Sequence, residues 1–216
     1  MTLSSFGNVT YCVSKGPTVK NVNVMRASVL MGHGDIDQLQ VREDMPIPRP
    51  GREEVLIRVG ASAVNNTDIN TRVGWYSQSR SEADAAWSGN PMKFPRIQGA
   101  DCCGQITSVG SAIDPARIGE RVLVRTMQEP VNVDGDLIPI TLGSEIEGAF
   151  AEYLSVRASE AFVIDSPLDD AELASFPCSY STAEGLLQRA RVGAERVLIT
   201  GASGGVGSAA VQLAAM

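Results

Sequence analysis

The sequence of 216 residues is poor in the side chains that most often build metal centres and proton relays. It has one histidine, His33, so the chain offers no site with two imidazoles. No two of its four cysteines have the C-x-x-C spacing of metal or redox motifs. These cysteines are Cys12, Cys102, Cys103 and Cys178. The adjacent pair cannot form a disulfide without strain, and we expect reduced thiols in a cytoplasmic protein.

Long hydrophobic runs and an excess of basic residues are also missing. No apolar run approaches the roughly 18 residues that a membrane-spanning helix needs. The N-terminus lacks the apolar core of a secretory signal. With 18 lysines and arginines against 25 aspartates and glutamates, the net charge is −7. A nucleic-acid-binding surface usually shows a basic stripe, so we expect neither a nucleic-acid nor a membrane partner.

The residues that are present divide the chain into three parts. Residues 1–24 are polar, and we predict a flexible extension. Residues 25–163 contain short alternating runs separated by glycine, proline and aspartate, which is typical of a barrel-like β unit. Two such runs flank a turn at 32–35, and Val55, Ile57 and Val59 share one face of a half-buried strand. The polar residues 76–95 predict a long loop.

After residue 163 the pattern changes from strands to helices. An acidic first turn predicts a helix over 166–176, which Pro177 stops or kinks, and a second helix follows over 179–193. The apolar run 196–200 predicts a buried strand of a parallel sheet. The last predicted helix has one apolar face, formed by Val206, Ala209, Ala210 and Leu213. This order predicts the opening of a doubly wound α/β domain.

The glycine-rich turn at 201–207 has the composition of a phosphate-binding site. Glycines let the backbone approach a phosphate more closely than a Cβ permits, and free N–H groups with the helix dipole favour the anion. The spacing departs from G-x-G-x-x-G, because Ala202 stands where the first glycine of that pattern would be. The alternative is a plain glycine-rich loop. The predicted cofactor-binding residues here are Gly201, Ser203, Gly204, Gly205, Val206 and Gly207.

From Met25 onward the chain resembles the medium-chain dehydrogenase/reductase superfamily, and within it the quinone oxidoreductase-like, zinc-independent branch. The segments that carry the resemblance occur in family order and include "VLIRVGASAVNNTDINTRVGWYS", "FPRIQGADCCGQITSVG", "IGERVLV", "GAFAEYLSV" and "VLITGASGGVGSAAVQLA". The resemblance implies an α/β plus β fold: a GroES-like β-barrel domain over 25–163, then the start of a Rossmann domain over 164–216. It also implies an active site in the cleft between them, NADP or NAD as cofactor, and homodimers among full-length relatives.

The same resemblance argues against zinc. Zinc alcohol dehydrogenases of this superfamily have three metal ligands where this chain has Asn65, Ala100 and Cys178. One thiol cannot hold the ion that three protein ligands normally bind. We therefore predict no metal site. For Cys178 the alternative is a small residue buried in packing.

Without a metal, hydrogen-bond donors must stabilise the negative charge that develops on a carbonyl oxygen during hydride transfer. The predicted catalytic residues are Asn65 as an amide donor, Asp68 as an orienting carboxylate and Tyr76 at the cleft edge. The resemblance places Thr182 near the nicotinamide. Each has a structural alternative: a turn for Asn65 and Asp68, a surface anchor for Tyr76 and a helix N-cap for Thr182. We predict that His33 lies on the surface.

These observations predict hydride transfer from NAD(P)H to a quinone or an α,β-unsaturated carbonyl. A zinc-dependent alcohol dehydrogenase is one alternative, and a non-catalytic fragment that serves binding or assembly is another. By comparison with the superfamily, we expect the chain to be truncated at its C-terminus and to lack the residue that selects NAD or NADP. We therefore expect it to bind NADP weakly or not at all and to tend to aggregate.

Overall fold

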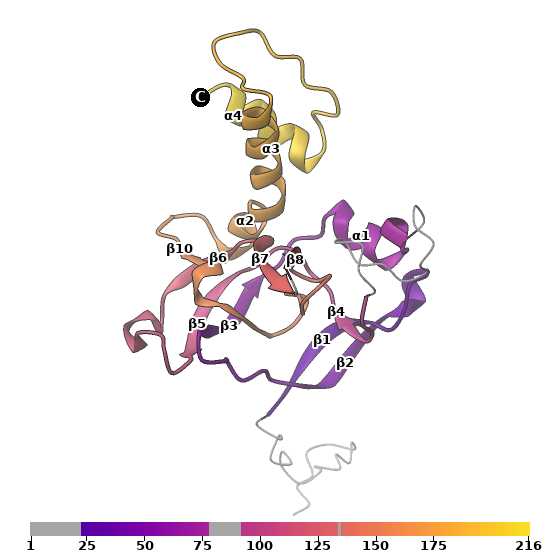
Figure 1. Ribbon diagram of the computed structural model, residues 1–216, viewed down its shortest axis with the longest axis vertical. Coiled ribbons are helices and arrows are strands. Elements are labelled where there is room, and N and C mark those ends of the chain that lie inside the picture. Colours follow the sequence, from indigo (N-terminus) through magenta and orange to yellow (C-terminus); the bar gives the residue numbers. More distant parts are fainter. Residues whose placement is uncertain (1–22, 78–91, 134) are drawn as a thin grey trace, which may run out of the picture.

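The computed structural model describes residues 23–77, 92–133 and 135–216 (Figure 1). Most of the predicted extension 1–24 and of the predicted loop 76–95 lies outside the described residues. Val24 already belongs to the first strand, and residues 75–77 form a short 3-10 helix.

The first sheet has three antiparallel strands in the order β2-β1-β4. Its strands are β1 (Val24–Leu30), β2 (Leu39–Pro46) and β4 (Arg96–Ile97). The first two flank the predicted turn at 32–35. Alternate residues of β1 point into the protein, and Val29 and Leu30 are almost completely buried.

The second sheet holds the main core and has five strands in the order β10-β6-β5-β3-β9. Its strands are β3 (Glu54–Ala61), β5 (Cys103–Val109), β6 (Arg121–Val124), β9 (Tyr153–Arg157) and β10 (Ala161–Val163). Val55 and Ile57 are fully buried in this core and Val59 packs against it, as their spacing predicts. A separate hairpin, β7 (Met127–Val133) with β8 (Asp136–Thr141), completes the strand-rich part.

One α-helix, α1 (Asn66–Arg72), lies between β3 and β4. Three more follow the last strand: α2 (Asp170–Ala174), α3 (Pro177–Arg189) and α4 (Gly205–Ala214). Figure 1 shows α3 and α4 extending away from the sheets, with the C-terminus beside α4. Pro177 opens α3 at its first helical position, where a missing N–H costs nothing. The apolar face predicted for α4 packs against Ala183 of α3.

The predicted strand over 196–200 is wrong for this structure. Among residues 23–77, 92–133 and 135–216, no strand pairs with this segment. Ile199 packs with α3 and α4, but Leu198 is 90% exposed. The physical reason is that a strand needs a neighbour to satisfy its N–H and C=O groups, and the described chain places none beside it.

Candidate active site

Asp68 lies in the first turn of α1, and its side chain is buried. Its Oδ2 accepts a hydrogen bond from the backbone N–H of Asn65 at 2.8 Å, and its Oδ1 accepts one from Ala100 at 3.0 Å. Burial raises the pKa of Asp68, and these backbone donors partly counteract the rise. The carboxylate therefore ties the start of α1 to the loop that follows β4, the geometry expected of an orienting group.

Asn65 stands at the N-cap of α1 and contacts a second buried carboxylate. Its Nδ2 donates to Oδ2 of Asp101 at 2.7 Å. Oδ1 of Asp101 accepts from the backbone N–H of Cys178 at 2.7 Å and from Oγ1 of Thr126 at 3.4 Å. Burial raises the pKa of Asp101 to about 6, although the hydrogen bonds from Asn65 and Cys178 oppose the rise.

A cleft of about 510 Å³ borders this network. Residues that line it include Thr67, Tyr76, Thr126, Thr141, Cys178 and Thr182. The hydroxyls of Thr67 and Tyr76 lie 3.1 Å apart and are hydrogen-bonded. The structure thus brings Tyr76 and Thr182 to one cleft, whereas Asn65 and Asp68 are not among the residues that line it.

Helix α3 forms the other wall of the cleft. Thr182 lies inside this helix and donates its hydroxyl to the backbone oxygen of Cys178 at 2.6 Å. The alternative interpretation of Thr182 as an N-cap is wrong, because α3 begins at Pro177. Cys178 is half-buried and lines the cleft, so it is not a pure packing residue. Burial, followed by the nearby carboxylates of Asp101 and Asp68, raises the pKa of its thiol to about 12.

The three positions where zinc alcohol dehydrogenases bind their metal do not fit a zinc ion. The amide of Asn65 is engaged by Asp101, and Ala100 carries no ligating atom. The thiol of Cys178 is thus the one ligating group among the three, whereas zinc sites in proteins use three or four protein ligands. Within the described ranges, no three His, Cys, Asp or Glu side chains are grouped so that they could hold a metal ion.

The glycine turn is tight and leaves the start of α4 without a side-chain cap. Gly201 has a positive φ of 65°, which a residue with a Cβ rarely adopts. A Cβ on Gly207 would collide with the backbone oxygen of Gly201. Gly204 is the N-cap of α4 and gives its first turn no side-chain hydrogen bond, while Ser203 and Gly205 are exposed beside it. The N–H groups at the start of α4 thus have no side-chain cap and face an open turn, as phosphate binding requires.

His33 does not lie freely on the surface, so that prediction is wrong. Its ring is half-buried, with Nδ1 2.8 Å from the backbone oxygen of Thr71 and its edge against the ring of Phe94. The turn at 32–35 folds back onto α1, where Arg72 also donates to the backbone oxygen of Gly34.

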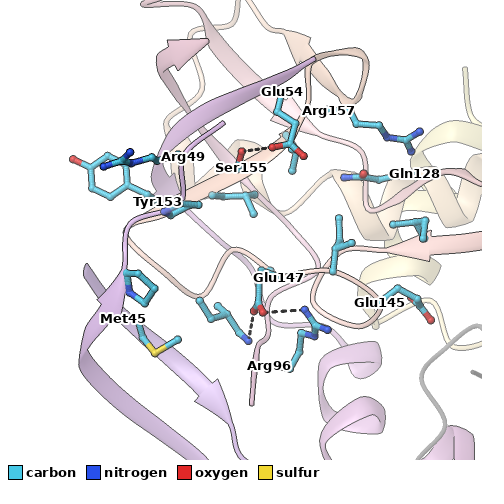
Figure 2. Close-up of a pocket in the computed structure, with 18 of the residues that line it drawn as sticks. Met45, Arg49, Glu54, Arg96, Gln128, Glu145, Glu147, Tyr153, Ser155 and Arg157 are labelled. Atoms are coloured by element: carbon cyan, nitrogen blue, oxygen red, sulfur yellow. Dashed lines mark hydrogen bonds and ion pairs between the residues drawn. The ribbon is translucent and has the colours of Figure 1, made fainter. Parts of the chain in front are cut away.

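A larger cavity of about 620 Å³ lies away from these groups, beside β9 and the β7–β8 hairpin (Figure 2). Arg96 donates to Glu147 at 2.9 Å, and Ser155 donates to Glu54 at 2.9 Å, so these two carboxylates are already paired. None of the predicted site residues lines this cavity. We therefore assign the candidate site to the smaller cleft, which holds the hydroxyl pair and adjoins Asp101.

Sequence reasoning missed Thr67, Asp101, Thr126 and Thr141. Thr67 lies two positions after Asn65, and Asp101 directly follows Ala100. The motifs that point to Asn65 and Ala100 could therefore have identified these two residues as well. Thr126 directly precedes β7 and Thr141 ends β8, and the pairing of Met127 with Thr141 brings them together at the cleft.

The family model described as alcohol dehydrogenase GroES-like domain matches residues 51–166. The chain belongs to this family and, with it, to the medium-chain dehydrogenase/reductase superfamily. The predicted fold class, a GroES-like β domain followed by the start of a Rossmann domain, is confirmed.

Individual relatives agree with this assignment. The chain is 27% identical over 191 residues to an NADPH-dependent alkenal/one oxidoreductase of Arabidopsis thaliana, covering 88% of this chain and 44% of that protein. It is 32% identical over 193 residues to quinone oxidoreductase of Homo sapiens, covering 88% and 50%. A crystal structure described as an alcohol dehydrogenase of Sinorhizobium meliloti 1021 matches with a TM-score of 0.80 and 43% identity, covering 89% and 55%.

The chain spans about half the length of these relatives. Two of them are named as an alkenal/one oxidoreductase and a quinone oxidoreductase, and the first is named as NADPH-dependent.

Cys102, Cys103 and Cys178 are free thiols, while Cys12 lies outside the described residues. No helix of the described ranges is long and apolar enough to cross a membrane.

Proposed function

We propose that this protein transfers hydride from NAD(P)H to a quinone or an α,β-unsaturated carbonyl without a metal ion. The observation that carries the proposal is the hydrogen-bonded hydroxyl pair of Thr67 and Tyr76, which faces α3 across the cleft. The names of the relatives support the substrate class. The residues at the three positions that correspond to the zinc ligands support the absence of a metal, because only Cys178 among them has a ligating side chain.

The nicotinamide cofactor fits the glycine turn. Gly201, Ser203, Gly204, Gly205, Val206 and Gly207 would hold its pyrophosphate through backbone N–H groups and the dipole of α4. Thr182 would lie beside the nicotinamide on the cleft wall. The bound cofactor supplies the hydride. We propose NADP rather than NAD, following the branch that the sequence resembles and the relative named for NADPH.

The protein's own contribution is the stabilisation of negative charge on the substrate oxygen. Preorganised donors aimed at that oxygen lower the barrier because they need not reorient during the reaction. Tyr76, with Thr67 hydrogen-bonded to it, supplies such a donor. Asn65 donates one of its two amide hydrogens to Asp101, so the second is still available as a donor. Asp68 accepts a hydrogen bond from the backbone N–H of Asn65 and holds that residue in place.

The same proposal includes a cytoplasmic location, a small-molecule substrate, no nucleic-acid or membrane partner, and homodimers among the full-length relatives. A zinc-dependent alcohol dehydrogenase remains the alternative within the fold, since one similar structure is described as a cobalt- and zinc-bound alcohol dehydrogenase. A non-catalytic binding or assembly fragment is the alternative from a different class.

Turnover of NADPH with 1,4-naphthoquinone and with an enone tests the proposal, together with metal analysis of the same sample. We expect turnover without stoichiometric zinc. We also expect Tyr76→Phe to lower kcat roughly ten- to hundredfold, because one donor to the developing charge is lost. Val41→Ala, on the exposed outer strand β2, is the control and should leave kcat unchanged.

The competing outcomes are distinct. One zinc per chain with loss of activity on chelation would favour the alcohol dehydrogenase alternative. Absence of NADPH binding and of turnover would favour the non-catalytic fragment. Full activity of Tyr76→Phe would remove the phenol from the mechanism.

A further inference from the structure

Asp101 connects the two walls of the candidate cleft. Its Oδ2 accepts from the side-chain amide of Asn65 at 2.7 Å, at the start of α1. Its Oδ1 accepts at the same distance from the backbone N–H of Cys178, which lies 77 positions later in the first turn of α3. The side chain is completely buried, and none of the ion pairs formed by the described residues includes it. Its charge is therefore compensated by neutral donors.

We propose that Asp101 is a positioning residue of the site: it orients the amide of Asn65 and anchors the start of α3 at the distance that the cleft requires. The inference rests on the proposed function, since it assigns Asp101 to the same hydride-transfer site. The inference adds Asp101 to the site as a residue that acts through Asn65 and α3. Asp101 is not itself among the residues that line the cleft.

A carboxylate suits this position because its two oxygens serve two different donors. An asparagine has only one acceptor oxygen and brings an amide donor in place of the second oxygen. If the single oxygen of an asparagine at position 101 accepted the hydrogen bond from Cys178, the new NH₂ group would face the NH₂ group of Asn65. Two donors would then oppose each other. The carboxylate also imposes an orientation on Asn65, because only the nitrogen of the Asn65 amide can donate to it.

The contact with Cys178 also caps α3. Phe176, the N-cap residue of this helix, provides no side-chain hydrogen bond to the first turn. Asp101 supplies the missing acceptor from a distant part of the chain, and a negative charge at a helix N-terminus is favourable. Because Thr182 is one turn further along the same helix, a shift of this anchor moves Thr182 relative to the Thr67–Tyr76 pair.

The test compares Asp101→Asn with the exchanged pair Asn65→Asp/Asp101→Asn in the whole 216-residue chain. The exchanged pair restores a hydrogen bond between positions 65 and 101 with donor and acceptor reversed, so it repairs packing but removes the amide from position 65. Asp169→Asn is the matched control, because Asp169 also accepts a backbone N–H at the start of a helix but is exposed on α2. Asparagine is an equally good N-cap there.

Two readouts decide the proposal. In ¹⁵N spectra, the two side-chain amide protons of Asn65 should be widely separated in the wild type and in Asp169→Asn, and should move together in Asp101→Asn. With NADPH and 1,4-naphthoquinone, Asp101→Asn should lower kcat roughly ten- to hundredfold, the scale of a small misplacement of a reacting group, with less effect on KM. The exchanged pair should recover the melting temperature but not kcat.

Either of two results would overturn the proposal. One is an unchanged Asn65 amide signal in Asp101→Asn. The other is recovery of kcat in the exchanged pair, which would make the role of Asp101 purely structural. A wild-type chain that binds NADPH but does not reduce the quinone would instead count against the proposed function, while the amide spectra would still decide whether Asp101 orients Asn65.

Discussion

The five-stranded sheet and the segment around α3 and α4 differ in how far they bury their apolar residues. In the sheet, Val55 and Ile57 are fully buried, and each central strand has a neighbour on both sides. In the helical segment, Leu198 is 90% exposed, Leu186 is 54% exposed and Val211 is 46% exposed. The contrast shows that an apolar run becomes a strand only where a partner strand is available, however strong its local preference.

The largest effect expected from this comparison comes from truncating one leucine in each region. Leu154→Ala, in β9, should lower the free energy of unfolding by about 2–5 kcal/mol, because it empties part of a packed core. Leu198→Ala should change it by less than about 0.5 kcal/mol, because that side chain is mostly in water. Chemical denaturation measures both, and equal losses would show that Leu198 is buried in solution.

An intermediate effect is expected within the helical segment. Gly207→Ala should destabilise this segment by about 1–3 kcal/mol, since the new Cβ would meet the backbone of Gly201 and Ala202. Gly185→Ala, in the interior of α3 with open space around it, should stabilise its helix by about 0.5–1 kcal/mol. Hydrogen exchange of the α3 and α4 amides measures the two changes. Greater protection in Gly207→Ala would contradict the tight turn.

The smallest effect concerns Asp101, which joins the two regions. Its pKa of about 6 in the folded protein exceeds the value of about 3.9 expected for the unfolded chain, so the folded state binds the proton more tightly. The stability that follows is fully present below about pH 4 and is lost as the pH rises through about 6. From pH 8 to pH 5, this group should stabilise the wild type by about 1–1.5 kcal/mol relative to Asp101→Asn. The pKa of Asp68 is also raised, so in both proteins this second group lowers the free energy of unfolding as the pH rises.

Denaturation of the wild type and Asp101→Asn at several pH values measures this difference. A constant difference between the two proteins from pH 5 to pH 8 would mean that Asp101 does not titrate in this range.

Sequence patterns predicted much of the β domain because its strands are local and alternate regularly. The pairing of β1 with β2 around a turn, the buried face of β3 and the apolar face of α4 all follow from spacing alone. Of the site residues proposed from the sequence, Tyr76 and Thr182 line the cleft, while Asn65 and Asp68 are not among its lining residues. Asp101 directly follows a motif residue, Ala100, but its contacts with Asn65 and Cys178 span distant parts of the sequence, and local patterns carry no information on such contacts.

The sequence by itself determined the family, the order of strands and helices, and the glycine turn, because these depend on residue type and on periods of two or a few positions. Only the tertiary structure decided that residues 196–200 are not a strand, that Thr182 lies inside a helix, and that a buried carboxylate joins Asn65 to α3. Each of those outcomes depends on which segments become neighbours, and hydrogen bonding and burial are settled between neighbours in space.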